Sequence, residues 1–189
     1  MDLIFSRRYY DTNTMKELLQ KLSEKFDEEA DKIKEFVTNN ANYSSDFFDI
    51  LPTFTSLGTR PRKMWGKKGV YIFLITKPVS LDYKIVSKWN EVTGAGFKSY
   101  HQPSLAVGDC LYVGSSDSLY GRMTEHFSPD SGAASLKLSH PNRKFALDSV
   151  CVYSFALKRD FIDYSSMIIT QIEKRLHNSL KPKAGSSRV

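Results

Sequence analysis

The stretch LYVGSSDSLYGRMTEHF (residues 111–127) decides the fold. A short apolar run ends at Gly114, small polar residues follow, and a second apolar pattern then carries Arg122 and His126 four positions apart. An apolar run closed by glycine is typical of a strand, and residues four apart share one face of a helix. The stretch therefore predicts a strand, over 110–114, that leads into a helix with an arginine and a histidine on one face.

Two further apolar runs predict strands that pair with the first. GVYIFLIT (69–76) and SVCVYSFAL (149–157) are both rich in β-branched and aromatic residues, the types that favour strands. In the earlier run, alternation places Tyr71 and Phe73 on one face and the residues between them on the other. The segment 77–109, which separates the first two strands, is too long for a hairpin turn.

Helical patterns occupy residues 13–37, 81–92 and 165–180. Thr14 and Glu17 have the spacing of a capping box at the start of the first pattern. Its apolar stripe either packs on the core of the domain, which we expect, or binds a partner or dimer helix. The stripe consists of Met15, Leu19, Leu22, Phe26, Ile33 and Val37.

The composition excludes several classes of protein. With 41% hydrophobic and 25% charged residues, the chain is typical of a soluble globular protein. No apolar run approaches the roughly 20 residues of a membrane-spanning helix, and the start MDLIFSRRYY does not resemble a signal peptide. Cys110 and Cys151 lie in strand-like runs, so we expect two buried thiols and a cytoplasmic protein.

The net charge of +6 is unevenly distributed. Residues 1–50 carry 7 Lys and Arg against 11 Asp and Glu, whereas residues 51–189 carry 20 against 10, which are net charges of −4 and +10. A basic second part favours a polyanionic partner. The candidate nucleic-acid contacts are Arg62, Lys63, Lys67 and Lys68, which precede the strand-forming run 69–76, and Lys137, Arg143 and Lys144, which follow the helix with the histidine.

Five side chains of chemical interest follow a recognisable order: GVY, then YVG, then an arginine eight residues after that glycine, a histidine four later, and a glutamate on the final helix. Over residues 66–182 this pattern resembles the GIY-YIG nuclease family. By motif position, the residues that match are Tyr71, Tyr112, Gly114, Arg122 and Glu173, and the Arg-x3-His pairing with His126 resembles restriction-enzyme members.

The resemblance implies an α+β fold, with a small three-stranded antiparallel sheet flanked by helices. It also implies metal-dependent hydrolysis of phosphodiester bonds. The chain would then divide into an N-terminal helical extension with a basic linker (1–65) and a nuclease domain (66–189) that contains the insertion 77–109. This layout is closest to stand-alone restriction or defence nucleases, with double-stranded DNA as substrate.

The roles expected of the five polar residues follow from the resemblance and from the needs of phosphodiester cleavage. Tyr71 would be the base toward water, and His126 would accept the proton of the tyrosine. Arg122 would clamp the scissile phosphate with its planar fork. Tyr112 would orient the phosphate or the water, and Glu173 would hold one Mg²⁺ or Mn²⁺.

One departure keeps a second interpretation open. Family members commonly have an asparagine where this chain has Gly185, and the candidates to substitute for it are Asn178, still within the final helix, and Ser186. The alternative is therefore a catalytically weakened nucleic-acid-binding or adaptor protein that retains the fold. RNA as a substrate and a homodimer also stay open. We expect the insertion and residues 128–144 to carry sequence or structure preference, because the motif residues contact only phosphate.

Overall fold

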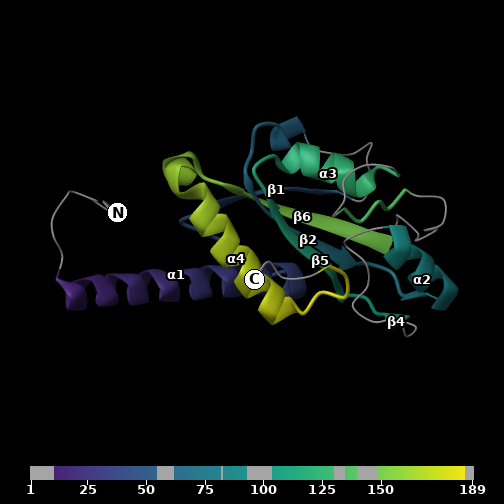
Figure 1. Ribbon diagram of the computed structural model, residues 1–189, viewed down its shortest axis with the longest axis horizontal. Coiled ribbons are helices and arrows are strands. Elements are labelled where there is room, and N and C mark those ends of the chain that lie inside the picture. The colour runs from purple at the N-terminus through teal and green to yellow at the C-terminus, as the bar shows by residue number, and fades with distance from the viewer. Residues whose placement is uncertain are drawn as a thin grey trace.

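The computed structural model describes residues 11–54, 62–81, 83–92, 104–129, 135–139 and 149–185. The fold is α+β, with a four-stranded antiparallel sheet between helices (Figure 1). The strand order is β1-β6-β2-β5, so β2 and β6 are central and β5 is an edge strand. The four strands are β1 (Phe48–Phe54), β2 (Gly69–Ile75), β5 (Cys110–Ser116) and β6 (Val150–Leu157).

Strand β1 corrects the expectation of three strands. It pairs with β6 at the edge of the sheet, and its register shifts between Leu51 and Phe54, next to Pro52. Proline lacks the N–H that a central strand needs, but an edge strand or a bulge tolerates it. The sequence predicted a linker here because Pro52 starts a segment rich in turn residues. The sheet therefore takes one strand from the segment that the sequence assigned to the N-terminal extension.

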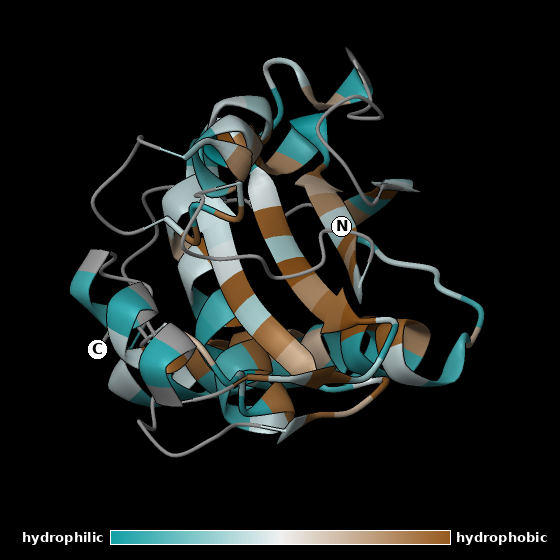
Figure 2. Ribbon diagram, turned by 90° about the vertical axis from the view of Figure 1, so that its right-hand side faces the viewer, coloured by the Kyte–Doolittle hydropathy of each residue, from teal (hydrophilic) through white to brown (hydrophobic). Residues whose placement is uncertain are grey.

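The two faces of the sheet carry separate cores, as the alternation in β2 predicted. Tyr71, Phe73 and Ile75 pack with α3 (Leu119–Phe127) and α2 (Tyr83–Val92), whereas the residues between them pack with α1 and α4. Figure 2 shows hydrophobic residues concentrated along the strands. In the insertion, β3 (Val79–Ser80) and β4 (Ser104–Leu105) form a two-stranded ribbon. The remaining short elements are the 3-10 turns η2 (Arg62–Met64) and η5 (Arg159–Tyr164).

The first helix begins earlier than its predicted cap. Helix α1 runs over Thr12–Asn39, and the carboxylate of Asp11 accepts hydrogen bonds from the backbone N–H groups of Asn13 and Thr14. Aspartate is among the strongest N-cap residues because it satisfies amides that the helix leaves unbonded. The prediction that Thr14 caps the helix is therefore wrong by one turn.

Helix α1 packs on the domain from Leu22 onward. Phe26, Ile33 and Val37 are buried against the sheet and α4 (Ser165–Leu180), but Met15 and Leu19 are 40% and 59% exposed. The start of the helix extends past the rest of the molecule (Figure 1). The expected packing on the core holds for the last four residues of the stripe, and the partner or dimer interpretation stays a prediction for Met15 and Leu19.

Other expectations have simple outcomes in the described residues. Cys110 is buried and Cys151 is half-buried, and neither of them is in a disulfide. No helix in the described ranges has the length and apolar character needed to cross a bilayer. The middle of the insertion, residues 93–103, lies outside the described residues, and so does most of 128–144. The expectation that these segments carry specificity therefore stays a prediction.

Candidate active site at the edge strand β5

Tyr71 lies across the backbone of its neighbouring strand. In the register of β2 with β5, Tyr71 is opposite Gly114. A Cβ atom at position 114 would lie 2.4 Å from Tyr71 Oη, far inside van der Waals contact. The glycine of the YVG tripeptide therefore leaves the space that the phenol of the GVY tripeptide occupies. Tyr71 is fully buried, which fixes its hydroxyl in one position.

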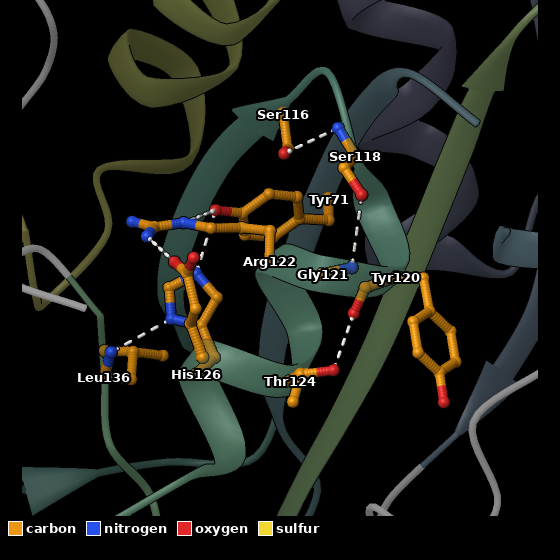
Figure 3. Close-up of polar contacts among 10 residues, drawn as sticks. Tyr71, Ser116, Ser118, Tyr120, Gly121, Arg122, Thr124, His126 and Leu136 are labelled. Carbon is orange, nitrogen blue, oxygen red and sulfur yellow. Dashed lines mark hydrogen bonds and ion pairs between the residues drawn. The ribbon is translucent and has the colours of Figure 1, made fainter. Parts of the chain in front are cut away.

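Helix α3 brings two nitrogen donors to that hydroxyl. Its apolar residues Leu119, Met123 and Phe127, spaced four apart, are fully buried and hold the helix on the sheet. Arg122 Nε donates to Tyr71 Oη at 3.3 Å, and His126 Nε2 lies 2.8 Å from the same oxygen. Figure 3 shows the guanidinium and the imidazole converging on the phenol. The predicted grouping of Tyr71, Arg122 and His126 is thus present.

The direction of the histidine bond differs from the prediction. The backbone N–H of Leu136 donates to His126 Nδ1 at 2.9 Å, and an N–H group can only donate. Nδ1 is therefore unprotonated, so the neutral imidazole carries its proton on Nε2. That proton points to Tyr71 Oη. His126 is accordingly a donor to the tyrosine, and the expectation that it accepts the proton of Tyr71 is wrong in this arrangement.

Burial keeps both rings neutral in the free protein. Burial lowers the pKa of His126 well below its usual 6.5, and the nearby Arg122 charge lowers it further. Burial also raises the pKa of Tyr71 well above 10, with a further contribution from Tyr112, while Arg122 acts to lower it. Since Tyr71 Oη faces two N–H donors, any negative charge that develops on this oxygen is met by hydrogen bonds already in place.

Glu173 reaches the same strand end from the opposite face of the sheet. It lies on α4, is only 6% exposed, and accepts a hydrogen bond of 2.5 Å from Ser115 Oγ. Ser115 directly follows Gly114, the residue under the Tyr71 hydroxyl. The site therefore straddles β5, with the Tyr71 group on one side and the carboxylate on the other. Ser115 was missed at the sequence level, although its place directly after YVG was a usable signal.

An open cleft of about 510 Å³ borders this arrangement. It lies between the end of β5, the start of α3 and the start of α4, with Ser115 and Arg122 in its lining. Tyr71, Tyr112 and Glu173 are not part of that lining. Glu125, also in the lining, forms an ion pair with Arg122, three residues earlier on α3. The sequence analysis missed this pair, although the spacing of three allows it on any helix.

Tyr112 explains the departure at Gly185. The ring of Tyr112 is nearly parallel to that of Tyr71, with centroids 6.1 Å apart. Gly185 has a φ of +76°, and a Cβ atom there would lie 2.5 Å from Tyr112 Cε2. The ring thus excludes any side chain at 185. Asn178 is exposed and lies five residues past Glu173 on α4, so it faces away from the site, and Ser186 is outside the described residues.

The donor set fits only one kind of metal site. Within the described ranges, no three His, Cys, Asp or Glu side chains come together as a metal cage. Glu173 is a single buried carboxylate that already accepts one hydrogen bond. Such a ligand suits Mg²⁺ or Mn²⁺ that keeps several waters and takes phosphate oxygens from a substrate. It does not suit an ion held by protein ligands alone.

The candidate basic contacts differ in how exposed they are to solvent. Lys63 and Lys67 are exposed, and Lys137 is half-buried. Lys68 is half-buried and bonds Asp117 at 3.2 Å and Ser165 at 3.3 Å, which links the loop before α3 to the start of α4. Arg143, Lys144 and the side chain of Arg62 lie outside the described residues, so their contacts stay predictions.

Comparison with known proteins adds no relative. No protein-family model matches the chain, and neither a curated protein nor a solved structure matches it significantly. A functional conclusion for this chain therefore depends on the order of its motif residues and on the geometry of the site.

Proposed function

We propose that this protein is a metal-dependent endonuclease of the GIY-YIG type that hydrolyses phosphodiester bonds of double-stranded DNA. The observation that carries the proposal is the buried Tyr71 hydroxyl, which meets N–H donors from Arg122 and His126 beside an open cleft. A tyrosine that only packs in a core needs one partner for its hydroxyl. Two donors on one phenol oxygen instead favour its ionised form.

Tyr71 is the group that takes a proton from the attacking water. Its own proton leaves to solvent first, and the N–H groups of Arg122 and His126 then stabilise the phenolate oxygen. His126 acts as a donor throughout, because Leu136 fixes its tautomer. Tyr112, stacked on Tyr71, bounds the space in which the water lies. The phenolate stays in place as the proton arrives, which is the advantage of a preorganised site.

Arg122 binds the phosphate from the cleft side. Its Nε is held by Tyr71, whereas its Nη1, which pairs with Glu125, borders the cleft. A phosphate oxygen can replace the Glu125 carboxylate on this nitrogen and keep a charge-assisted bond. The charge that develops on the phosphate during cleavage is then met by a fixed guanidinium.

A divalent cation is part of the proposal because of the buried carboxylate of Glu173, which lies behind Ser115 at the cleft. The two carboxylates that line the cleft, Asp117 and Glu125, are offset by ion pairs with Lys68 and Arg122. The charge of Glu173 would instead be offset by a bound cation, which would also reduce its repulsion of a phosphodiester. When bound, Mg²⁺ or Mn²⁺ supplies Lewis-acid stabilisation of the phosphate and of the leaving oxygen. Glu173 is the residue that would hold it, since it is the buried carboxylate at the end of β5.

The proposal extends the α+β fold to a GIY-YIG-like arrangement of β2, β5 and β6, with β1 and α1 as additions. The alternative, a nucleic-acid-binding or adaptor protein that retains the fold, has one observation in its favour. The Tyr112 ring leaves no space for a side chain at Gly185, where the related enzymes commonly have an asparagine. The donors on Tyr71 favour the enzyme, because binding alone does not require a buried phenol with two N–H partners.

The test is cleavage with matched tyrosine variants. Supercoiled DNA, linear DNA and an RNA transcript are incubated with the protein in Mg²⁺, Mn²⁺ or EDTA. We expect cleavage of DNA with either metal and none in EDTA. Tyr71→Phe should lower the rate about 10²- to 10⁴-fold, the usual contribution of a general base. Tyr153→Phe removes a hydroxyl from a half-buried ring on the opposite core and should keep the rate. Equal rates for the two variants would contradict the role of Tyr71.

A further inference from the structure

An exposed tryptophan lies beside α3, on the side away from the Tyr71 site. Trp65 is 65% exposed, although tryptophan is usually largely buried in folded proteins. Its ring lies against that of Tyr120, with centroids 4.6 Å apart and planes tilted by 34°. Figure 3 shows Tyr120 projecting from α3 away from Arg122 and His126. We call Trp65 with Tyr120 the aromatic platform.

The aromatic platform is held by a rigid turn. Met64, next to Trp65, is fully buried in the core under α3. The N–H of Lys67 donates to the Met64 carbonyl at 3.2 Å, which closes the turn. The N–H of Leu119, the first residue of α3, donates to the Lys67 carbonyl at 2.9 Å. The position of Trp65 is thus set by its neighbours, while its own ring contributes little burial to the fold.

The charged residues nearest to Trp65 in the sequence are basic. Lys63 and Lys67 flank Trp65 in the sequence and are exposed. Lys68 comes next in the sequence and forms an ion pair with Asp117, which lines the cleft. An exposed aromatic ring between lysines has the chemistry of single-strand nucleic-acid sites, in which a base stacks on the ring and the backbone phosphates meet the cations. Because Tyr120 orders the ring in advance, stacking costs little side-chain entropy.

We propose that the aromatic platform binds an unpaired nucleobase, with Lys63 and Lys67 on the adjoining phosphates. This inference rests on the proposed function for the class of partner, and it specifies the substrate further. A paired base in a regular duplex presents no free face, so the substrate would carry a single-stranded flank or an extruded base. Tyr120 and Arg122 are two positions apart, about 200° around α3. The stacked base and the scissile phosphate therefore lie on opposite sides of this helix.

The test measures binding in EDTA, so that cleavage does not enter it. Fluorescein-labelled single-stranded DNA and RNA of one sequence, and the matched blunt DNA duplex, are titrated with wild type, Trp65→Ala, Trp65→Phe and Lys67→Gln. Stacking of one base predicts that Trp65→Ala weakens single-strand binding about 5- to 150-fold, with the duplex affected far less. Trp65→Phe keeps a ring and should retain most of the affinity. Comparison of the DNA and RNA arms shows which strand supplies the base.

Lys67→Gln is the matched control for charge. It should reduce the slope of log affinity against log salt by about 0.7 to 0.9, whereas Trp65→Ala should leave that slope unchanged. A Trp89→Phe variant leaves Trp65 as the sole tryptophan, and a bound single strand should quench its fluorescence. Single-strand affinity that is the same in wild type and Trp65→Ala would overturn the inference, even if the protein cuts duplex DNA. Loss of affinity in Trp65→Ala from a protein that cuts nothing would keep the platform and remove the proposed nuclease.

Discussion

Gly114→Ala is the substitution that most directly perturbs the geometry of the candidate site. The added Cβ would lie 2.4 Å from Tyr71 Oη and 2.5 Å from its Cζ, whereas ordinary contact begins at 3.4 Å. The phenol must therefore move by about 1 Å. A shift of that size breaks or lengthens the bonds of 2.8 Å to His126 and 3.3 Å to Arg122. Tyr71 is only 1% exposed, so bulk solvent does not fully make up for the loss of these two donors.

Two costs follow from this movement. Leaving a buried polar group without its partner costs about 1–3 kcal/mol, and forcing an extra carbon into a packed site costs about 1–3 kcal/mol. The free energy of unfolding should therefore fall by about 2–6 kcal/mol. If Tyr71 is the base, a misplacement of about 1 Å should also lower the cleavage rate on the order of 10²-fold.

Urea denaturation and single-turnover cleavage measure the two effects separately. Gly121→Ala on α3 is the matched control, because its Cβ would meet only the side chain of the N-cap residue Ser118, whose Oγ lies 3.0 Å away and needs to shift by only a few tenths of an ångström. Alanine also favours a helix over glycine by about 1 kcal/mol, so this variant should be near neutral or stabilised. Unchanged stability and rate in Gly114→Ala would refute the close approach of Tyr71 to β5 and the reasoning built on it.

Three further predictions follow from the same contacts. The pKa of His126 is lowered by burial and then by Arg122. Its contribution to stability is therefore full above about pH 6.5 and is lost as the pH falls, by at most about 1.4 kcal/mol per pH unit. Urea melts at several pH values should show a smaller acid loss in His126→Gln, and identical slopes would contradict the buried neutral imidazole. Gly185→Asn should cost about 1–3 kcal/mol by overpacking against Tyr112, and combining it with Tyr112→Ala should remove that penalty. Glu125→Gln removes the charge that pairs with Arg122 and should tighten DNA affinity about 2- to 5-fold in anisotropy titrations, so unchanged or weaker binding would count against the exchange on Arg122.

The sequence predicted those parts of the fold whose patterns are local. The all-buried run GVYIFLI, the YVG strand and the final helix all appear within one or two residues of their expected bounds. Strand β1 was not predictable in the same way, because its pairing with β6 is a contact across about 100 residues and Pro52 masks its pattern. The exposed start of α1 was also hidden, since periodicity shows that a stripe exists but not how far its partner surface extends.

In the candidate site, sequence spacing predicted the grouping of Tyr71, Arg122 and His126 but not the positions of their protons. Helical spacing was enough to place Arg122 and His126 on one face of α3. The tautomer of His126 depends instead on the amide of Leu136, in a segment with no local pattern that points to the histidine. The close approach of the Tyr112 ring to Gly185 likewise involves two segments that are distant in the sequence, and only the folded chain brings them into contact.

The most direct test of the proposed chemistry compares wild type with Glu173→Gln, with cleavage and DNA affinity measured on the same preparations. Glutamine keeps the size of the side chain and a group that can accept the hydrogen bond of Ser115, but it loses the charge that retains a hard divalent cation. We predict that wild type cuts DNA in Mg²⁺ or Mn²⁺, and that Glu173→Gln binds DNA at least as tightly while its cleavage collapses. Wild-type protein that binds DNA yet leaves every DNA and RNA substrate intact with both metals, or a Glu173→Gln variant that cuts as fast as wild type, would contradict the nuclease proposed here.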